Sequence, residues 1–173
     1  WAVLRIRHAY VNLDWGKSAV LVGITWHPLF GAVMPDVLNL STGAPFQPFN
    51  RSPQIRYQYK ANSRVQLTAS VLWQLQYLSS GPKGMSEDYI KNSCIPEMFV
   101  GADFTPADGW LMGLGAHMIS LKPRTSTEWK EQTFKVNERM TAFSYEAHLK
   151  YSGRNYTFAA KTLMASALDH TAL

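Results

Sequence analysis

The sequence predicts an all-β protein, an antiparallel β-barrel of about eight strands in a single domain spanning residues 1–173. Three observations predict it: a two-residue alternation of apolar and polar side chains, turn residues at regular intervals, and connections that are alternately short and long. The clearest strand runs from Val65 to Tyr77, where every odd position is apolar or aromatic and five of the six even positions are polar. A period of two indicates a strand with two different faces, whereas a helix repeats every 3.6 residues.

Seven weaker segments repeat this alternation, and no segment predicts a helix. They cover residues 4–10, 20–26, 54–60, 97–104, 110–121, 143–151 and 156–167. Tight turns containing Gly, Asn or Asp are predicted at residues 14–17, 61–64, 106–109 and 152–155. Longer loops, roughly residues 28–50, 79–93 and 123–135, lie between them. This order is typical of outer-membrane barrels, which have short turns on one side of the membrane and long loops on the other.

Alternation alone does not say which face of the sheet meets water. In a soluble sandwich or lipocalin-like barrel the apolar face points inward, whereas in a membrane barrel the interior is polar. The strand ends favour the membrane alternative, because Trp and Tyr cluster there around an aliphatic band, as in an interfacial girdle. The predicted girdle residues are Trp15, Trp26, Tyr57, Tyr59, Trp73, Tyr77, Trp110, Tyr151 and Tyr156.

Composition narrows the classes of partner. The net charge of +5 favours anionic lipid, lipopolysaccharide or small anions. The basic residues are scattered singly, which argues against nucleic acid. Cys94 is the only cysteine, so neither an intrachain disulfide nor an all-cysteine metal site is expected. The chain opens at Trp1 without Met or a leader, from which we expect it not to be a complete precursor.

Charged residues recur at the inward positions of the predicted barrel. The predicted pore-lining residues are Arg5, Arg7, Arg56, Lys60, Glu97, Asp103, Glu146, Lys150 and Lys161. Rings of Arg and Lys favour anions at a constriction, so one hypothesis is a mildly anion-selective lumen. The other is that the charges pair across strands and only keep the lumen wet.

The predicted loop Pro28–Asn50 is almost uncharged and rich in apolar residues. A free extracellular loop should be polar, so we expect this one to pack on something. Folding into the lumen, as a constriction or substrate platform, is one interpretation. Burial at a subunit contact is the other.

The sequence does not predict a catalytic centre. The five histidines lie in no recognisable nucleophile context, and no Gly-x-Ser-x-Gly occurs. Gly113-Leu114-Gly115 lies on a predicted strand, where Gly more often permits close packing than binds phosphate. No His pair has helical metal-ligand spacing, so we expect no metal and no cofactor.

Three phrases resemble a known family. They are the arginine-bearing strand Leu4–Leu13, the Gly-x-x-Trp-x-Pro-x-Phe strand at residues 21–30, and the Arg-x-Pro-Gln-Ile-Arg phrase at residues 51–57. Together they resemble the DcaP-like and related outer-membrane porins, most clearly over residues 4–57. The resemblance implies a homotrimeric barrel in the bacterial outer membrane for passive diffusion of small, often anionic, solutes.

The chain also departs from that family. Such porins have more than eight strands, a signal peptide and commonly a terminal aromatic residue, whereas this chain ends at Leu173. With short turns on the periplasmic side, both chain ends would be extracellular, so we expect part of a larger barrel. A soluble lipocalin-like barrel that binds a small hydrophobic ligand is the alternative.

Overall fold

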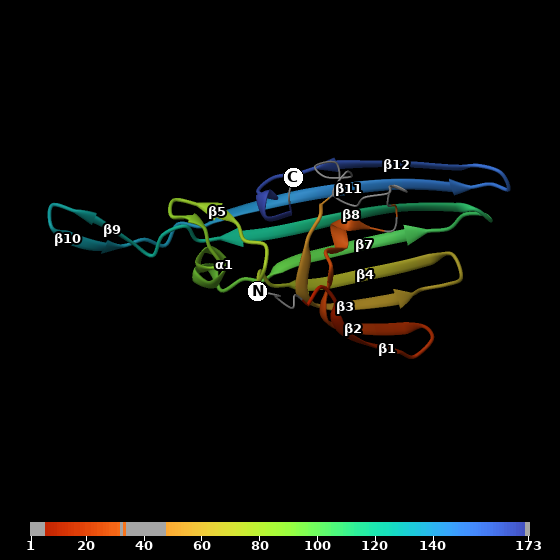
Figure 1. Cartoon of the computed structure of the whole chain (residues 1–173), viewed down its shortest axis with the longest axis horizontal. Coiled ribbons are helices and arrows are strands. Elements are labelled where there is room, and N and C mark those ends of the chain that lie inside the picture. Colours follow the sequence, from red (N-terminus) through yellow and green to blue (C-terminus); the bar gives the residue numbers. More distant parts are fainter. Residues whose placement is uncertain (1–5, 32, 34–47, 172–173) are drawn as a thin grey trace, which may run out of the picture.

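A single antiparallel sheet forms the centre of the computed structural model, which describes residues 6–31, 33 and 48–171 (Figure 1). Its strands are β1 (Ala9–Asp14), β2 (Ser18–Trp26), β3 (Arg51–Lys60), β4 (Val65–Leu72), β7 (Glu97–Phe104), β8 (Trp110–Leu121), β11 (Met140–Ser152) and β12 (Thr157–Met164). They pair in that order, each with the next strand of the sheet along the chain. The predicted all-β fold with eight antiparallel strands is confirmed. Among the described residues, β1 and β12 are the two edges and no pairing closes the sheet into a barrel.

The predicted alternation of short and long connections is also confirmed. The four short turns lie at one end of the sheet, on the right of Figure 1. The long connections carry two small hairpins and a helix near the opposite end (Figure 1). These elements are β5 (Ser80–Gly81) with β6 (Gly84–Met85), α1 (Asp88–Ser93), and β9 (Ser126–Trp129) with β10 (Gln132–Lys135). Two 3-10 helices, η1 (Pro28–Phe30) and η3 (Asp169–Thr171), follow β2 and β12.

The helix α1 was not predicted, because six residues are too few to show a helical period. Tertiary packing accounts for it: Tyr89 and Ile90 are buried against Ile119, Leu121 and Ala142. A helix this short is not stable alone and depends on such contacts. None of the helices in the described part of the chain is long and apolar enough to span a membrane.

Several predicted strands have other bounds in the structure, and two of them differ most. The strand predicted at Val65–Tyr77 stops at Leu72. Beyond it the Gln74 side chain is fully buried and is hydrogen-bonded to Ser79 and Glu97, which turns the chain away from the sheet. The first strand begins only at Ala9, while residues 1–5, including Leu4 and Arg5, lie outside the described residues.

Cross-strand rows show that one face of the sheet, here called the apolar face, is exposed. One row pairs Val11, Val22, Ile55, Val71, Met98, Met118 and Phe143 across seven strands. Six of these seven side chains are at least 40% exposed. The next two rows toward the turns carry Val100 and Leu114, which are 58% and 67% exposed. A contiguous apolar surface of this extent is uncommon on a soluble monomer and marks a contact with lipid or protein.

The opposite face, here called the polar face, is covered. Its buried side chains include Gln54, Ser70, Glu97, His117, Ser144, Glu146 and His148. Part of the cover comes from η1 and the segment before η3, because Leu29 and Leu168 pack on Leu72 and Phe99. Burial is therefore reversed relative to a soluble barrel: the polar face is enclosed and the apolar face is open.

Candidate functional site on the polar face

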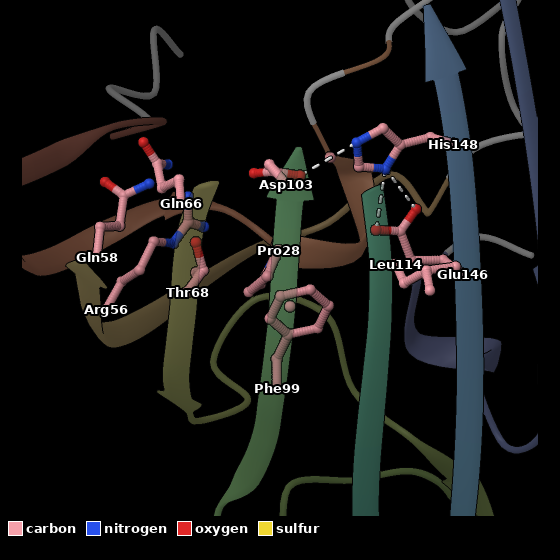
Figure 2. Close-up of a pocket in the computed structure, with 12 residues that line it drawn as sticks. Pro28, Arg56, Gln58, Gln66, Thr68, Phe99, Asp103, Leu114, Glu146 and His148 are labelled. Atoms are coloured by element: carbon pink, nitrogen blue, oxygen red, sulfur yellow. Dashed lines mark hydrogen bonds and ion pairs between the residues drawn. The ribbon is translucent and has the colours of Figure 1, made fainter. Parts of the chain in front are cut away.

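A cavity of about 240 Å³ lies on the polar face. Its walls come from β3, β4, β7, β8 and β11, and Pro28 and Gly31 of the residue 28–50 loop contribute to its lining. Figure 2 shows Arg56, Gln58, Gln66 and Thr68 on one side of the cavity and Asp103, His148 and Glu146 on the other. The strands place these side chains together because each occupies a polar-face position in the alternation.

One wall is an acidic pair with a histidine between its members. The Nε2 atom of His148 lies 3.2 Å from Oδ1 of Asp103, and Nδ1 lies 3.2 Å from Oε2 of Glu146 (Figure 2). His148 is paired with Gly113 across the sheet, and a Cβ atom at Gly113 would lie 2.2 Å from the His148 ring. Because Gly113 has no side chain, the His148 imidazole can occupy this space. Gly115 does the same for Phe99 and Glu146, so the prediction that these glycines permit close packing is confirmed.

The opposite wall carries a fixed guanidinium group. The Nη2 atom of Arg56 donates to the Trp26 carbonyl at 2.7 Å and to Oε1 of Gln54 at 2.7 Å, and Nε donates to the same Gln54 oxygen at 3.1 Å. These bonds hold the group in one orientation. The cavity therefore has a cationic wall and a histidine–carboxylate wall.

We expect Gly113→Ala to displace His148 and to lower the free energy of unfolding by about 1–3 kcal/mol, the usual cost of overpacking. Denaturant titration of the folded protein measures this effect. The matched control is the same substitution in a His148→Ala background. There only the end of the flexible Asp103 side chain, 2.6 Å from the new Cβ atom, must move, so the cost should be clearly smaller. Equal costs in both backgrounds would contradict the packing explanation.

Lysine 161 fastens the loop after β2 to this face. Its Nζ atom donates to the carbonyl oxygens of Leu29 and Phe30, the latter at 3.0 Å. Pro28, Leu29, Phe30 and Val33 are all buried. The prediction that this loop packs on something is confirmed for the described residues, whereas residues 32 and 34–47 lie outside them.

A second cluster surrounds Glu97, the first residue of β7. The Nε2 atoms of His27, His117 and His170 each lie 3.3 Å from its Oε2 atom. Its other oxygen, Oε1, accepts a hydrogen bond of 2.9 Å from Gln74. All five side chains are at most 1% exposed. His27 lies just before the loop of residues 28–50, His117 lies in β8, and His170 lies in η3. The cluster therefore connects segments that are far apart in the sequence.

Burial and the Glu97 carboxylate shift the pKa values of His27 and His170 in opposite directions. Burial lowers the pKa of His27 to about 4, although the nearby Glu97 carboxylate opposes the shift. His27 Nδ1 also accepts a 3.2 Å hydrogen bond from the Leu29 amide. For His170, burial acts in the same direction, but attraction and hydrogen bonding by Glu97, with help from Asp169, outweigh it and raise the pKa. At neutral pH His27 is therefore uncharged, whereas the surroundings of His170 favour its protonated form.

The structure brings most of the predicted pore-lining residues to one face. Arg56, Lys60, Glu97, Asp103, Glu146, Lys150 and Lys161 all occupy polar-face positions. Arg7 precedes β1 and is exposed, and Arg5 lies outside the described residues. Glu97 differs from the prediction in its surroundings. Enclosed by three histidines, it presents no open charge.

The predicted aromatic residues separate into two groups. At the turn end, Trp15, Tyr57, Tyr59 and Tyr156 are exposed, while Trp110 and Tyr151 contact each other with ring centroids 4.7 Å apart.

At the opposite end of the sheet, the predicted aromatic residues lie among the long connections. Trp26 stacks on Phe30 at 4.4 Å and carries the Arg51 guanidinium 3.9 Å above its ring. Trp73 packs against the cluster around Ile90, and Tyr77, in the connection after β4, is partly buried. Trp26 and Trp73 therefore have partners in the folded connections, and their place in a girdle stays a prediction.

Sequence reasoning missed the histidine cluster. Its members lie at positions 27, 97, 117 and 170, and such long separations leave no local motif. The phase of β8 could have placed His117 on the same face as Gly113 and Gly115. Nothing comparable locates His27 or His170, which depend on the fold of the connecting segments.

Comparison with known proteins returns no relative of this chain. No protein-family model, no curated protein and no solved structure matches it. The function of the site is therefore inferred from its geometry and from the two faces of the sheet.

Proposed function

We propose that the sheet is part of the wall of an outer-membrane β-barrel that lets small solutes diffuse passively. The observation that supports this most is the orientation of the two faces. Apolar side chains are exposed across the sheet, while the polar-face side chains are buried at its loop end and partly buried toward the turns. A membrane barrel needs this arrangement, with lipid outside and a polar interior. The exposed aromatic residues at the turn end support it, since such residues prefer the membrane interface.

A soluble lipocalin-like barrel is the less favourable alternative. Such a barrel would bury its apolar side chains around the ligand and expose the polar ones. Here Leu114 is 67% exposed, whereas Ser144 on the neighbouring strand is fully buried. This reversal, repeated over the sheet, is the reason for preferring the membrane wall.

The two edges favour a barrel of more than eight strands. Among the described residues, β1 and β12 each have a single neighbour. Unpaired backbone N–H and C=O groups are not tolerated in lipid, because no water is present to satisfy them. In the proposed barrel, both edges therefore pair with further strands.

The polar face favours small anions as solutes. Glu97 has three histidine partners, and Asp103 and Glu146 share His148 between them. Arg56, Lys60 and Lys150 form no ion pair with a carboxylate within the described residues. Uncompensated basic groups on a lumen wall lower the cost of admitting an anion. The loop anchored by Lys161 would then narrow the lumen beside Arg56.

A porin-like wall also implies a location and partners for the chain. The chain would reside in the outer membrane of a bacterium, with its apolar face against lipid and its long connections near lipopolysaccharide. The homotrimer implied by the family resemblance is proposed with it. Chemical cross-linking in detergent tests that assembly, because a trimer gives a ladder ending at three chains.

Two measurements test the proposal as a whole. A folded barrel should migrate faster than its boiled form on a denaturing gel, and the purified protein should open discrete conductance steps in a planar bilayer. A chain that stays folded and monomeric without detergent, and that conducts no ions, would overturn it.

We expect the pore to prefer chloride over potassium, because the open charges on its wall are basic. Reversal potentials under a salt gradient measure this preference. Exchange of Lys60 and Lys150 for Gln should move the ratio of chloride to potassium permeability toward unity. Lys130→Gln, in the exposed turn between β9 and β10, should leave it unchanged. Preference for potassium in the unmodified protein would contradict the assignment of an anion pore.

A further inference from the structure

The buried cluster around Glu97 has the composition of a metal site. Three imidazoles and one carboxylate converge, and each is at most 1% exposed. For His27, Glu97 and His117, one ligand atom from each residue lies within 4.8 Å of the others. We propose that these three residues bind a divalent transition metal ion, best fitted by Zn²⁺. His170, whose Nε2 atom lies 3.3 Å from the same Glu97 oxygen but not within 4.8 Å of every other ligand atom, would shift to become the fourth ligand. This inference does not depend on the proposed pore.

The distances from the Glu97 oxygen to the three nitrogens agree with a tetrahedral ion. Structural zinc has four ligands, with Zn–N and Zn–O bonds of about 2.0–2.2 Å. Ligand atoms at the corners of such a tetrahedron are separated by about 3.3–3.5 Å. The Nε2 atoms of His27, His117 and His170 lie 3.3 Å from Oε2 of Glu97. Binding requires that the imidazoles move together around the ion and that the His27 ring proton changes its place.

Hydrogen bonding alone explains the cluster poorly. Neutral N–H···O bonds usually measure about 2.9–3.0 Å, whereas all three contacts here are longer and share one oxygen. Within the described residues, the Nδ1 atom of His117 is buried without a hydrogen-bond partner, and the interaction of the His170 ring outside the cluster is with the Ala167 backbone. When Nε2 binds a metal, a neutral imidazole carries its proton on Nδ1. No hydrogen bond seen in the described part of the chain prevents this in either ring.

His27 is the ligand that must change most. Its Nδ1 atom accepts the Leu29 amide proton, so its Nε2 atom carries the ring proton in the absence of metal. Coordination through Nε2 moves the ring proton to Nδ1, and coordination through Nδ1 after a turn of the ring occupies that atom. In either case the hydrogen bond from the Leu29 amide is lost. Metal binding is therefore coupled to the loop that begins at Pro28.

Ligand chemistry selects the class of ion. Imidazole nitrogens with one carboxylate suit zinc, copper or nickel, whereas calcium and magnesium prefer sites made only of oxygen ligands. Complete burial and four protein ligands match a structural rather than a catalytic zinc site. The ion would join the residue 28–50 loop, β7, β8 and η3 as a cross-link.

The first test uses the full chain without an affinity tag. Protein stripped with EDTA and dialysed against Zn²⁺ should retain a single zinc ion per chain by elemental analysis and should unfold at a higher temperature. Loading with Co²⁺ instead should give the intense visible absorption of a four-coordinate ion. Absence of both retained zinc and this absorption would overturn the proposal.

Matched variants locate the ion. His117→Gln and His27→Gln should each weaken zinc retention at least tenfold, while His8→Gln, at an exposed position, should retain it as well as the unmodified chain. Equal loss in all three variants would place the ion elsewhere and overturn the assignment. The Co²⁺ spectrum of the unmodified chain remains decisive where a variant fails to fold.

Discussion

Leu114→Arg is expected to destabilise the folded protein by about 2–4 kcal/mol in lipid, the cost of a cationic side chain near the midplane on the lipid face of a barrel. Leu114 is 67% exposed and is paired with Ala147 near the middle of the long strand β11. If this face met water, the same change would alter stability by no more than about 0.5 kcal/mol, because exposed positions tolerate charge. The two environments therefore predict clearly different results.

Phe158→Arg is the control for depth. Phe158 lies on the same face and is 54% exposed, but it is paired with Tyr151 next to the β11–β12 turn. Near the membrane interface the cost of Arg falls to about 0–1 kcal/mol. Denaturant titration in lipid vesicles measures both variants. Equal and negligible effects would contradict the proposal that this face contacts lipid.

Glu97→Ala is expected to lower the free energy of unfolding by about 3–5 kcal/mol, the usual cost of removing one partner from a buried charged network. The substitution leaves His27, His117 and His170 without their shared acceptor and takes the carboxylate from Gln74. It also opens a void in a site that is at most 1% exposed. The loops fastened by these histidines should loosen together.

Measurement in EDTA keeps this effect separate from metal binding. Denaturant titration gives the loss of stability, and proteolysis near η1 and η3 reports the loosening. Glu128→Ala, on the exposed strand β9, should change stability by no more than about 0.5 kcal/mol. A loss of similar size at both positions would show that Glu97 has no special role.

Much of the sheet could be predicted because its signal is local. The alternation over Val65–Leu72 and Trp110–Leu121 follows from the two-residue period of any strand. Turn residues such as Gly16 and Gly109 mark the ends because they allow a positive φ, here 84° and 80°. The alternation of side chains was sufficient to place Arg56, Asp103 and Lys161 on one face.

The elements in the long connections could not be predicted in the same way. The helix α1 exists because Tyr89 and Ile90 find a buried surface on β8 and β11, which lie later in the chain. The strand ending at Leu72 was predicted too long because its alternation continues in the sequence while the Gln74 side chain turns inward. In both cases a distant contact outweighs the local pattern.

The sequence by itself determined the strands, their order and which side chains share a face, since these depend on neighbours in the chain. Only the tertiary structure decided which face is covered, because that depends on where η1, α1 and η3 fold. It also decided that Glu97 gathers His27, His117 and His170, whose positions are 20 to 73 residues away from it. Contacts over such separations carry no periodic signal, so they become visible only when the chain has folded.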